Sequence, residues 1–177
     1  GRALLVHGVA GAVLGLRVAD GAAQAIPDES TPVDSPGARL IIEEAMKDDD
    51  RPLHIAFYGP VTDIASALLL EPKIEDRGIR VIWIGGGAWP SGGREYNLSN
   101  DIHAANVLMK SNLEVWQVPR STYRTMSVGY AELIEKVYPQ GEIGKLRSAH
   151  QHMTRVTRTR ASTSSIVGNR STASLAK

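Results

Sequence analysis

A carboxylate and an amide stand two residues apart at Glu95 and Asn97, directly after a glycine-rich stretch. In an extended segment, side chains two apart point to the same side. Their oxygen and N–H groups then match the spacing of adjacent hydroxyl groups on a sugar. The pair therefore predicts a binding site for a sugar, although a loop held by its own hydrogen bonds would use the same two residues.

The glycine-rich stretch itself covers residues 85–93, with the order G-G-G-A-W-P-S-G-G. Glycine lets a ligand approach the backbone closely. The order lacks the G-x-G-x-x-G spacing of dinucleotide sites and the lysine of a P-loop, so it does not favour a phosphate-binding loop. Trp89 in this stretch offers an indole ring that can stack on a base or cover a pocket.

Short apolar runs alternate with amphipathic segments along the middle of the chain. The predicted strands are Leu53–Tyr58, Ile79–Ile84 and Glu114–Val118. The predicted helices cover residues 1–16, 36–46, 64–70, 102–110 and 128–138. This alternation indicates an α/β protein with a Rossmann-like, open, mainly parallel sheet and helices on both faces.

Ligands of such sheets bind beyond the carboxyl ends of the strands. The loops Tyr58–Asp63 and Gly85–Asp101 are therefore expected to carry the site. Among the remaining candidates, we expect Trp83, Trp116 and His54 in the core. Thr62 or Asp63, and Asp101, are expected as helix N-caps. His103, on the helix after Asp101, is an alternative candidate for a side chain that faces the site.

Composition divides the chain into two parts. The whole chain has 177 residues, a formal net charge of +1 and no cysteine, which excludes disulfides, thiolate metal sites and a cysteine nucleophile. From Lys145 onward there are seven Lys or Arg and eleven Ser or Thr, but no Asp or Glu. We expect a partial α/β domain over 1–144 and a basic tail over 145–177. The tail is either a flexible arm for anionic surfaces or the product of a shifted reading frame.

Neither a membrane nor a nucleic-acid partner is expected. The longest apolar stretch, residues 3–16, is shorter than the roughly 18 residues that a spanning helix needs. A signal peptide is the alternative for this stretch. The basic tail has no aromatic side chain that could stack on bases. We expect a cytoplasmic protein and leave a homo-oligomer open.

Three motifs resemble the inosine/uridine-preferring nucleoside hydrolases. Residues 59–65, G-P-V-T-D-I-A, resemble the family's G-P-L-T-N-I-A turn. Residues 82–87, I-W-I-G-G-G, resemble its V-x-M-G-G-G strand exit. Residues 95–105 resemble its E-F-N-x-x-x-D-P-x-A-A segment. The resemblance extends over roughly Asp28–Gly144, so this chain looks like the middle section of a longer enzyme.

The resemblance implies a Ca²⁺-dependent N-glycosidase of purine and pyrimidine salvage. Such enzymes cleave a ribonucleoside to ribose and free base with a Ca²⁺-activated water. By resemblance, Glu95 and Asn97 would hold ribose hydroxyls, and Trp89 is the candidate for the base. The backbone carbonyl of Tyr58 falls where the family offers a main-chain Ca²⁺ ligand.

Two parts of the family pattern have no counterpart here. The N-terminal D-x-D-x-x-x-D-D motif supplies Ca²⁺ carboxylates and the general base in the family, but no acidic residue precedes Asp20. The family's late His-Asp pair is missing as well. We therefore assign no catalytic residue, expect most Ca²⁺ ligands to be absent, and expect this chain alone to be an inactive fragment. The alternative is a non-catalytic sugar- or nucleoside-binding protein of the same fold.

Overall fold

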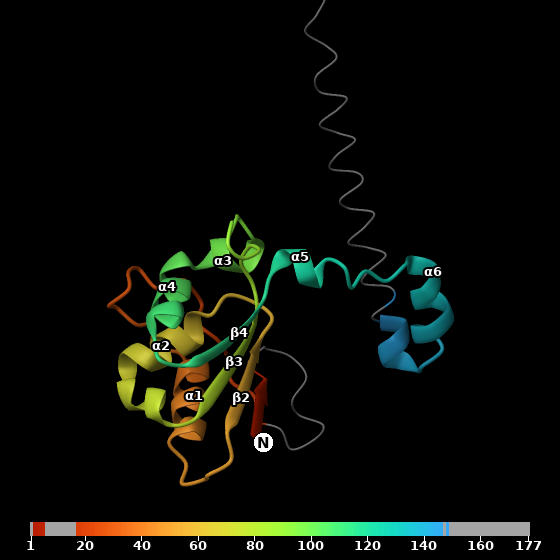
Figure 1. Cartoon of the computed structure of the whole chain (residues 1–177). Coiled ribbons are helices and arrows are strands. Elements are labelled where there is room, and N and C mark those ends of the chain that lie inside the picture. Colours follow the sequence, from red (N-terminus) through yellow and green to blue (C-terminus); the bar gives the residue numbers. More distant parts are fainter. Residues whose placement is uncertain (1, 6–16, 147, 149–177) are drawn as a thin grey trace, which may run out of the picture. The chain divides into compact units, whose positions relative to one another are not determined.

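The computed structural model describes residues 2–5, 17–146 and 148 of the chain (Figure 1). It divides into two compact units, Gly1–Thr125 and Met126–Lys177, and we describe each by itself. The boundary expected at residue 144 rests on composition and stays a prediction.

The first unit is built on a parallel sheet of four strands in the order β1-β2-β3-β4. The strands are β1 (Arg2–Leu5), β2 (Leu53–Phe57), β3 (Ile79–Ile84) and β4 (Glu114–Val118). The last three confirm the predicted strands. The helix predicted over 1–16 is wrong at Arg2–Leu5, and its remainder lies outside the described residues. Alanine and leucine favour helices, but pairing with the edge of β2 overrides that weak preference.

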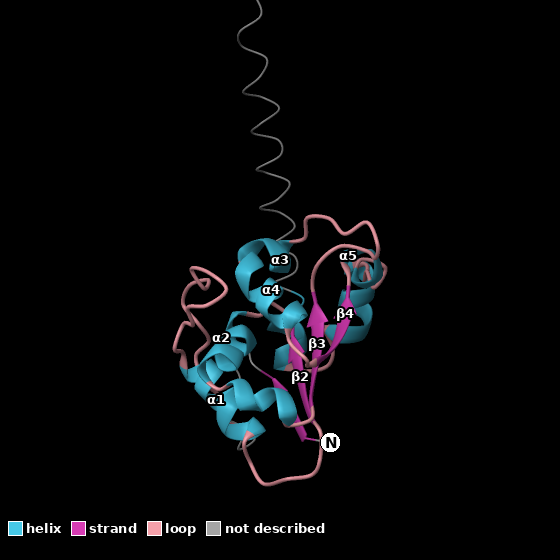
Figure 2. Ribbon diagram, turned by 60° about the vertical axis from the view of Figure 1, so that its left-hand side comes forward, coloured by secondary structure: helices cyan, strands magenta, loops and turns pink. Residues whose placement is uncertain are grey.

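Three helices lie along one face of this sheet (Figure 2). They are α1 (Pro36–Ala45), α2 (Thr62–Leu70) and α4 (Ile102–Lys110), and α2 packs against both of the others. Alternate side chains of β2 and β3 enter the core beneath them: Leu53, Ile55, Phe57, Ile79, Val81 and Trp83. The intervening side chains are half-buried.

Shorter helical elements complete the two units. In the first unit they are the 3₁₀ helix η2 (Pro72–Asp76), α3 (Tyr96–Asn100) and α5 (Arg120–Tyr123). The second unit has α6 (Tyr130–Glu132), which continues as the π-helix η3 (Leu133–Val137). The helix predicted over 128–138 is thus present in outline, with Gly129 at the N-cap position.

The start of α1 is fixed by side chains from two segments. Ser35 is its N-cap: the Ser35 hydroxyl accepts a hydrogen bond from Ala38 N at 3.0 Å and donates one to Asp63 Oδ1 at 2.5 Å. The backbone N–H of Ala22 donates to the same oxygen at 2.9 Å. Asp63 therefore anchors α1 and the preceding loop instead of capping α2. The N-cap position of α2 is Val61, which makes no side-chain capping bond.

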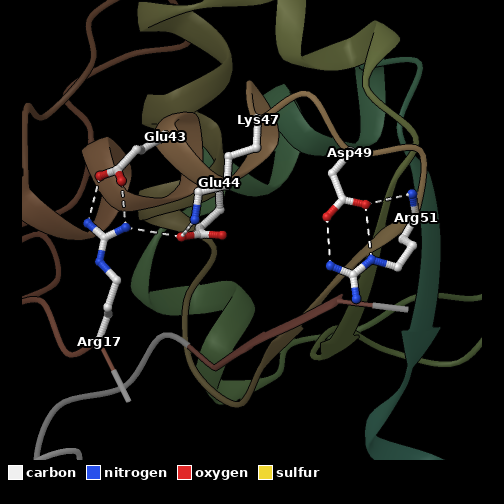
Figure 3. A network of polar contacts seen from close by, with 6 residues as sticks. All are labelled: Arg17, Glu43, Glu44, Lys47, Asp49 and Arg51. Atoms are coloured by element: carbon white, nitrogen blue, oxygen red, sulfur yellow. Dashed lines mark hydrogen bonds and ion pairs between the residues drawn. The ribbon is translucent and has the colours of Figure 1, made fainter. Parts of the chain in front are cut away.

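The end of α1 carries a network of surface ion pairs (Figure 3). The Arg17 guanidinium forms two hydrogen bonds of 2.6 Å with the Glu43 carboxylate and a third of 3.0 Å with Glu44. Lys47 also pairs with Glu44, and Arg51 pairs with Asp49 in the following turn. Water and salt screen such exposed pairs, so they orient the segments more than they stabilise the fold.

Asp101 joins three segments in the buried interior. Its side chain is 3% exposed and caps α4, since Oδ1 accepts a hydrogen bond from Ala104 N at 2.9 Å. Its other oxygen accepts one from Ile26 N at 3.0 Å and one from the Thr62 hydroxyl at 2.6 Å. The predicted cap is confirmed, and the same carboxylate also fastens the 17–35 loop to the first turn of α2.

Asp101→Ala is expected to lower the free energy of unfolding by about 2–4 kcal/mol, because it leaves buried N–H and O–H donors without acceptors. Urea unfolding followed by circular dichroism measures the change. Asp48→Ala, a substitution of the same kind at an exposed residue, is the control and should change stability little. Equal stability of the two variants would contradict the tethering role of Asp101.

Candidate active site

The loops after β2 and β3 meet at the carboxyl ends of these neighbouring parallel strands. Asn97, buried on α3, bridges them: its Nδ2 donates to the carbonyl of Tyr58 at 3.3 Å and to that of Ile84 at 2.7 Å. The structure thus brings together the Tyr58 carbonyl and the Asn97 amide, two of the groups singled out from the sequence. It does so through a direct hydrogen bond.

The two bonds fix which way the Asn97 amide faces. Both acceptors are carbonyl oxygens, so the amide nitrogen must face them and Oδ1 must face away. Within the described ranges, no donor forms a hydrogen bond with Oδ1. This oxygen is nevertheless not one of the fully buried atoms without a partner, which are Arg80 Nε and Ser148 Oγ among the described residues. Asn97 Oδ1 is therefore an oriented acceptor with no donor among the described residues, on a side chain that is itself buried.

Glu95 is the second buried polar residue of the site, with 4% of its surface exposed. Its Oε2 accepts hydrogen bonds from Gly86 N at 2.9 Å and Leu98 N at 3.0 Å, the latter as N-cap of α3. Its Oε1 accepts one from the Tyr123 hydroxyl at 2.8 Å. Burial raises the pKa of Glu95, but the backbone N–H donors and the Tyr123 hydroxyl outweigh it and lower the pKa overall. Glu95 is thus a carboxylate at neutral pH.

The glycines after β3 are required by the protein's own close contacts. Gly86 has φ +73°, and a Cβ there would lie 2.4 Å from Gln117 Nε2. A Cβ at Gly87 would lie 2.0 Å from the carbonyl oxygen of Gly92, across the bridge between Ala88 and Gly92. The sequence suggested close approach by a ligand, whereas the structure shows that the glycines let the loop fold onto itself.

Of the three tryptophan predictions, one is confirmed, one is wrong and one is not tested. Trp83 is buried, and its Nε1 donates to the Gly59 carbonyl at 3.1 Å, which confirms a core position. The core position predicted for Trp116 is wrong: the residue is 51% exposed, because β4 is an edge strand. The Arg80 guanidinium carbon lies over its ring, 4.5 Å from the ring centroid. Trp89 is 92% exposed, so its role toward a base stays a prediction.

Among the described residues, neither histidine candidate forms a hydrogen bond with Glu95 or Asn97. The core position predicted for His54 is wrong: it is half-buried on β2, where its Nε2 contacts the Arg80 guanidinium at 3.0 Å. His103 is exposed on α4. Tyr123 was not predicted from the sequence, because its short helix shows no periodic pattern and no motif includes it.

The described residues do not by themselves fit a Ca²⁺ ion, which takes six to eight oxygen ligands. The Tyr58 carbonyl already accepts a bond from Asn97, and three donors surround the Glu95 carboxylate. Within the part of the chain that the structure describes, no group of three or more Asp, Glu, His or Cys could hold a metal. The remaining residues contain no Asp or Glu.

Comparison with known proteins gives the family and the fold of the chain. Residues 2–172 match the family profile described as inosine-uridine preferring nucleoside hydrolase. The chain belongs to this family. A search of curated proteins gives no match. As a member of the nucleoside hydrolase family, the chain has the expected α/β fold, and none of its described helices is long and apolar enough to cross a membrane.

Solved nucleoside hydrolases share the fold. The plant nucleoside hydrolase PpNRh1 superposes with a TM-score of 0.63 and 18% identity, over 78% of this chain and 52% of that one. The purine-preferring ribonucleoside hydrolase from Gardnerella vaginalis gives a TM-score of 0.55 and 26% identity, over 65% of this chain and 37% of that one. The chain therefore corresponds to about half the length of the plant enzyme.

Proposed function

We propose that this chain provides the ribose-binding part of an enzyme that hydrolyses the N-glycosidic bond of ribonucleosides to ribose and free base. One observation carries the proposal: Glu95 and Asn97 hold oriented oxygen acceptors at the carboxyl ends of β2 and β3. Ribose presents neighbouring hydroxyl donors, which such acceptors bind. Membership of the nucleoside hydrolase family supports the same substrate class.

The charge of Glu95 suits this reaction. Breaking the bond to the base leaves positive charge on the sugar ring, in an oxocarbenium-like transition state. A carboxylate held in place by three hydrogen bonds favours that charge without having to reorganise. Glu95 would therefore bind ribose and stabilise the transition state. We assign no general base among the described residues.

The test incubates the full-length protein with a panel of purine and pyrimidine ribonucleosides. Chromatography measures the release of free base. We expect release from ribonucleosides and a much lower rate with the 2′-deoxy forms, which lack one hydroxyl donor. Saturable nucleoside binding without base release would support the alternative, a sugar- or nucleoside-binding protein. Neither binding nor release would contradict both functions.

Ca²⁺ dependence of the full-length enzyme is part of the proposal, with most of the ligands of the ion absent from this chain. We therefore expect millimolar Ca²⁺ to leave the thermal midpoint of this 177-residue chain unchanged. In the full-length protein, a chelator should abolish base release, and added Ca²⁺ should restore it. A clear stabilisation of this chain by Ca²⁺ would contradict the assignment of the ligands elsewhere.

A further inference from the structure

The hydroxyl of Tyr123 is the one side-chain donor on Glu95 among the described residues. Gly86 N and Leu98 N, which belong to the backbone, both bind Oε2, and the backbone N–H of Asn97 also lowers the pKa of the Glu95 carboxyl. Tyr123 binds Oε1 at 2.8 Å. A carboxylate oxygen accepts about two hydrogen bonds, so Oε2 is fully occupied and Oε1 keeps one position. Oε1 is thus the oxygen that remains for a ligand.

The segment carrying Tyr123 is fastened to the same glycine loop that holds Glu95. The N–H of Arg120, at the start of α5, donates to the Gly86 carbonyl at 3.0 Å, while the N–H of Gly86 donates to Glu95. The N–H of Gly85 donates to the carbonyl of Val118 at 3.2 Å. Gly86 therefore connects Glu95 and α5 through its two backbone groups, which sets the distance from the Tyr123 hydroxyl to Glu95.

We propose that Tyr123 is a positioning residue for nucleoside hydrolysis: its hydroxyl holds Glu95 Oε1 so that the remaining lone pair faces a ribose hydroxyl. This inference rests on the proposed function. The bond is charge-assisted, since a neutral hydroxyl donates to a carboxylate, and such bonds are stronger than neutral ones. Without it, Oε1 would turn toward water and lose its orientation.

Tyr123→Phe removes the hydroxyl and keeps the ring. In the full-length protein we expect kcat/KM for ribonucleosides to fall about 10- to 100-fold, the range for a hydrogen bond to a charged group. Tyr138→Phe is the matched control, since Tyr138 is an exposed tyrosine of the second unit, and should leave kcat/KM unchanged. Hydrolysis by Tyr123→Phe at the wild-type rate would overturn the inference on Tyr123 and leave the proposed function intact.

A double-mutant cycle separates positioning from general support of the fold. If Tyr123 acts through Glu95, adding Tyr123→Phe to Glu95→Gln should reduce the residual rate little, because the carboxylate is already gone. A full 10- to 100-fold further loss in the Glu95→Gln background would overturn the positioning role. Absence of any nucleoside binding or hydrolysis by the wild-type protein would instead refute the proposed function itself.

The contact can also be measured without activity. Burial, the hydrogen bond to Glu95 and the charge of that carboxylate raise the pKa of Tyr123, against the opposing charges of Arg120 and Arg124. In spectra of the protein with isotope-labelled tyrosine, the Tyr123 signal should titrate at a lower pH in Glu95→Gln than in the wild type. An unchanged titration would show that the bond does not form, and would overturn the inference.

Discussion

Asn97→Ala is expected to reduce nucleoside hydrolysis by the full-length protein about 100-fold or more. The substitution removes Oδ1, the acceptor proposed for a ribose hydroxyl, and losses of this size follow removal of one oriented polar group that contacts the reacting part of a substrate. It also removes the donor that bridges the carbonyls of Tyr58 and Ile84. Steady-state rates with a ribonucleoside measure the first effect, and urea unfolding measures the second.

The two effects have different sizes. Two carbonyls left without a donor at the ends of β2 and β3 should cost about 1–3 kcal/mol of stability, and water can partly replace the lost bonds. Asn112→Ala is the control, because that exposed amide bonds to Glu75 on the surface. A folded Asn97→Ala protein that hydrolyses nucleosides at the wild-type rate would refute the ribose-binding role of Asn97.

Gly87→Ala is expected to lower the free energy of unfolding by about 3 kcal/mol. The added methyl group would lie 2.0 Å from the carbonyl oxygen of Gly92 and 2.5 Å from the backbone nitrogen of Gly93. Both are backbone atoms, so no side chain can turn away to make room. The loop must open, and opening it also moves Gly86 N away from Glu95. Nucleoside hydrolysis should therefore fall together with stability.

Gly59→Ala is the matched control for this prediction. Gly59 follows β2 as Gly87 follows β3, but no atom lies within 4 Å of a Cβ built on Gly59. Its alanine variant should unfold within about 0.5 kcal/mol of the wild type. Chemical unfolding of the two variants side by side gives the comparison. Similar stability of both would show that the glycine loop is looser than its contacts indicate.

The parts of the fold predicted correctly depend on local patterns. The strands at 79–84 and 114–118 are runs rich in β-branched and aromatic residues, and the structure has them with the same bounds. Asp101 caps α4 three residues ahead of the N–H that it binds, a relation visible in the sequence. Such signals need no knowledge of the tertiary structure.

The errors concern contacts between distant residues. Asp63 looked like a cap because it directly precedes the helix predicted over 64–70, yet its partners are Ser35 and Ala22. Trp116 looked like core because it lies on a strand, but exposure depends on which strand is at the edge. A single sequence contains neither the strand order nor the partners of a carboxylate.

For the candidate site, the residue types were predicted and their partners were not. Glu95 and Asn97 stood out as a sugar-binding pair, with a hydrogen-bonded loop as the alternative. In the structure both residues hold the loop together, and each retains an oxygen that can face a ligand. Tyr123 was missed because it lies 28 residues beyond Glu95, on a helix too short to show a periodic pattern.

This separation has a consequence for the protein during its synthesis. Glu95 leaves the ribosome 28 residues ahead of the tyrosine that completes its hydrogen bonds. At about 5–20 residues per second, the nascent chain has to wait roughly 1–6 seconds for that partner. Throughout that interval Gly86 and Leu98 can already hold one oxygen, while the other faces water. The ligand-facing side of the carboxylate is thus the last to be set as the chain emerges.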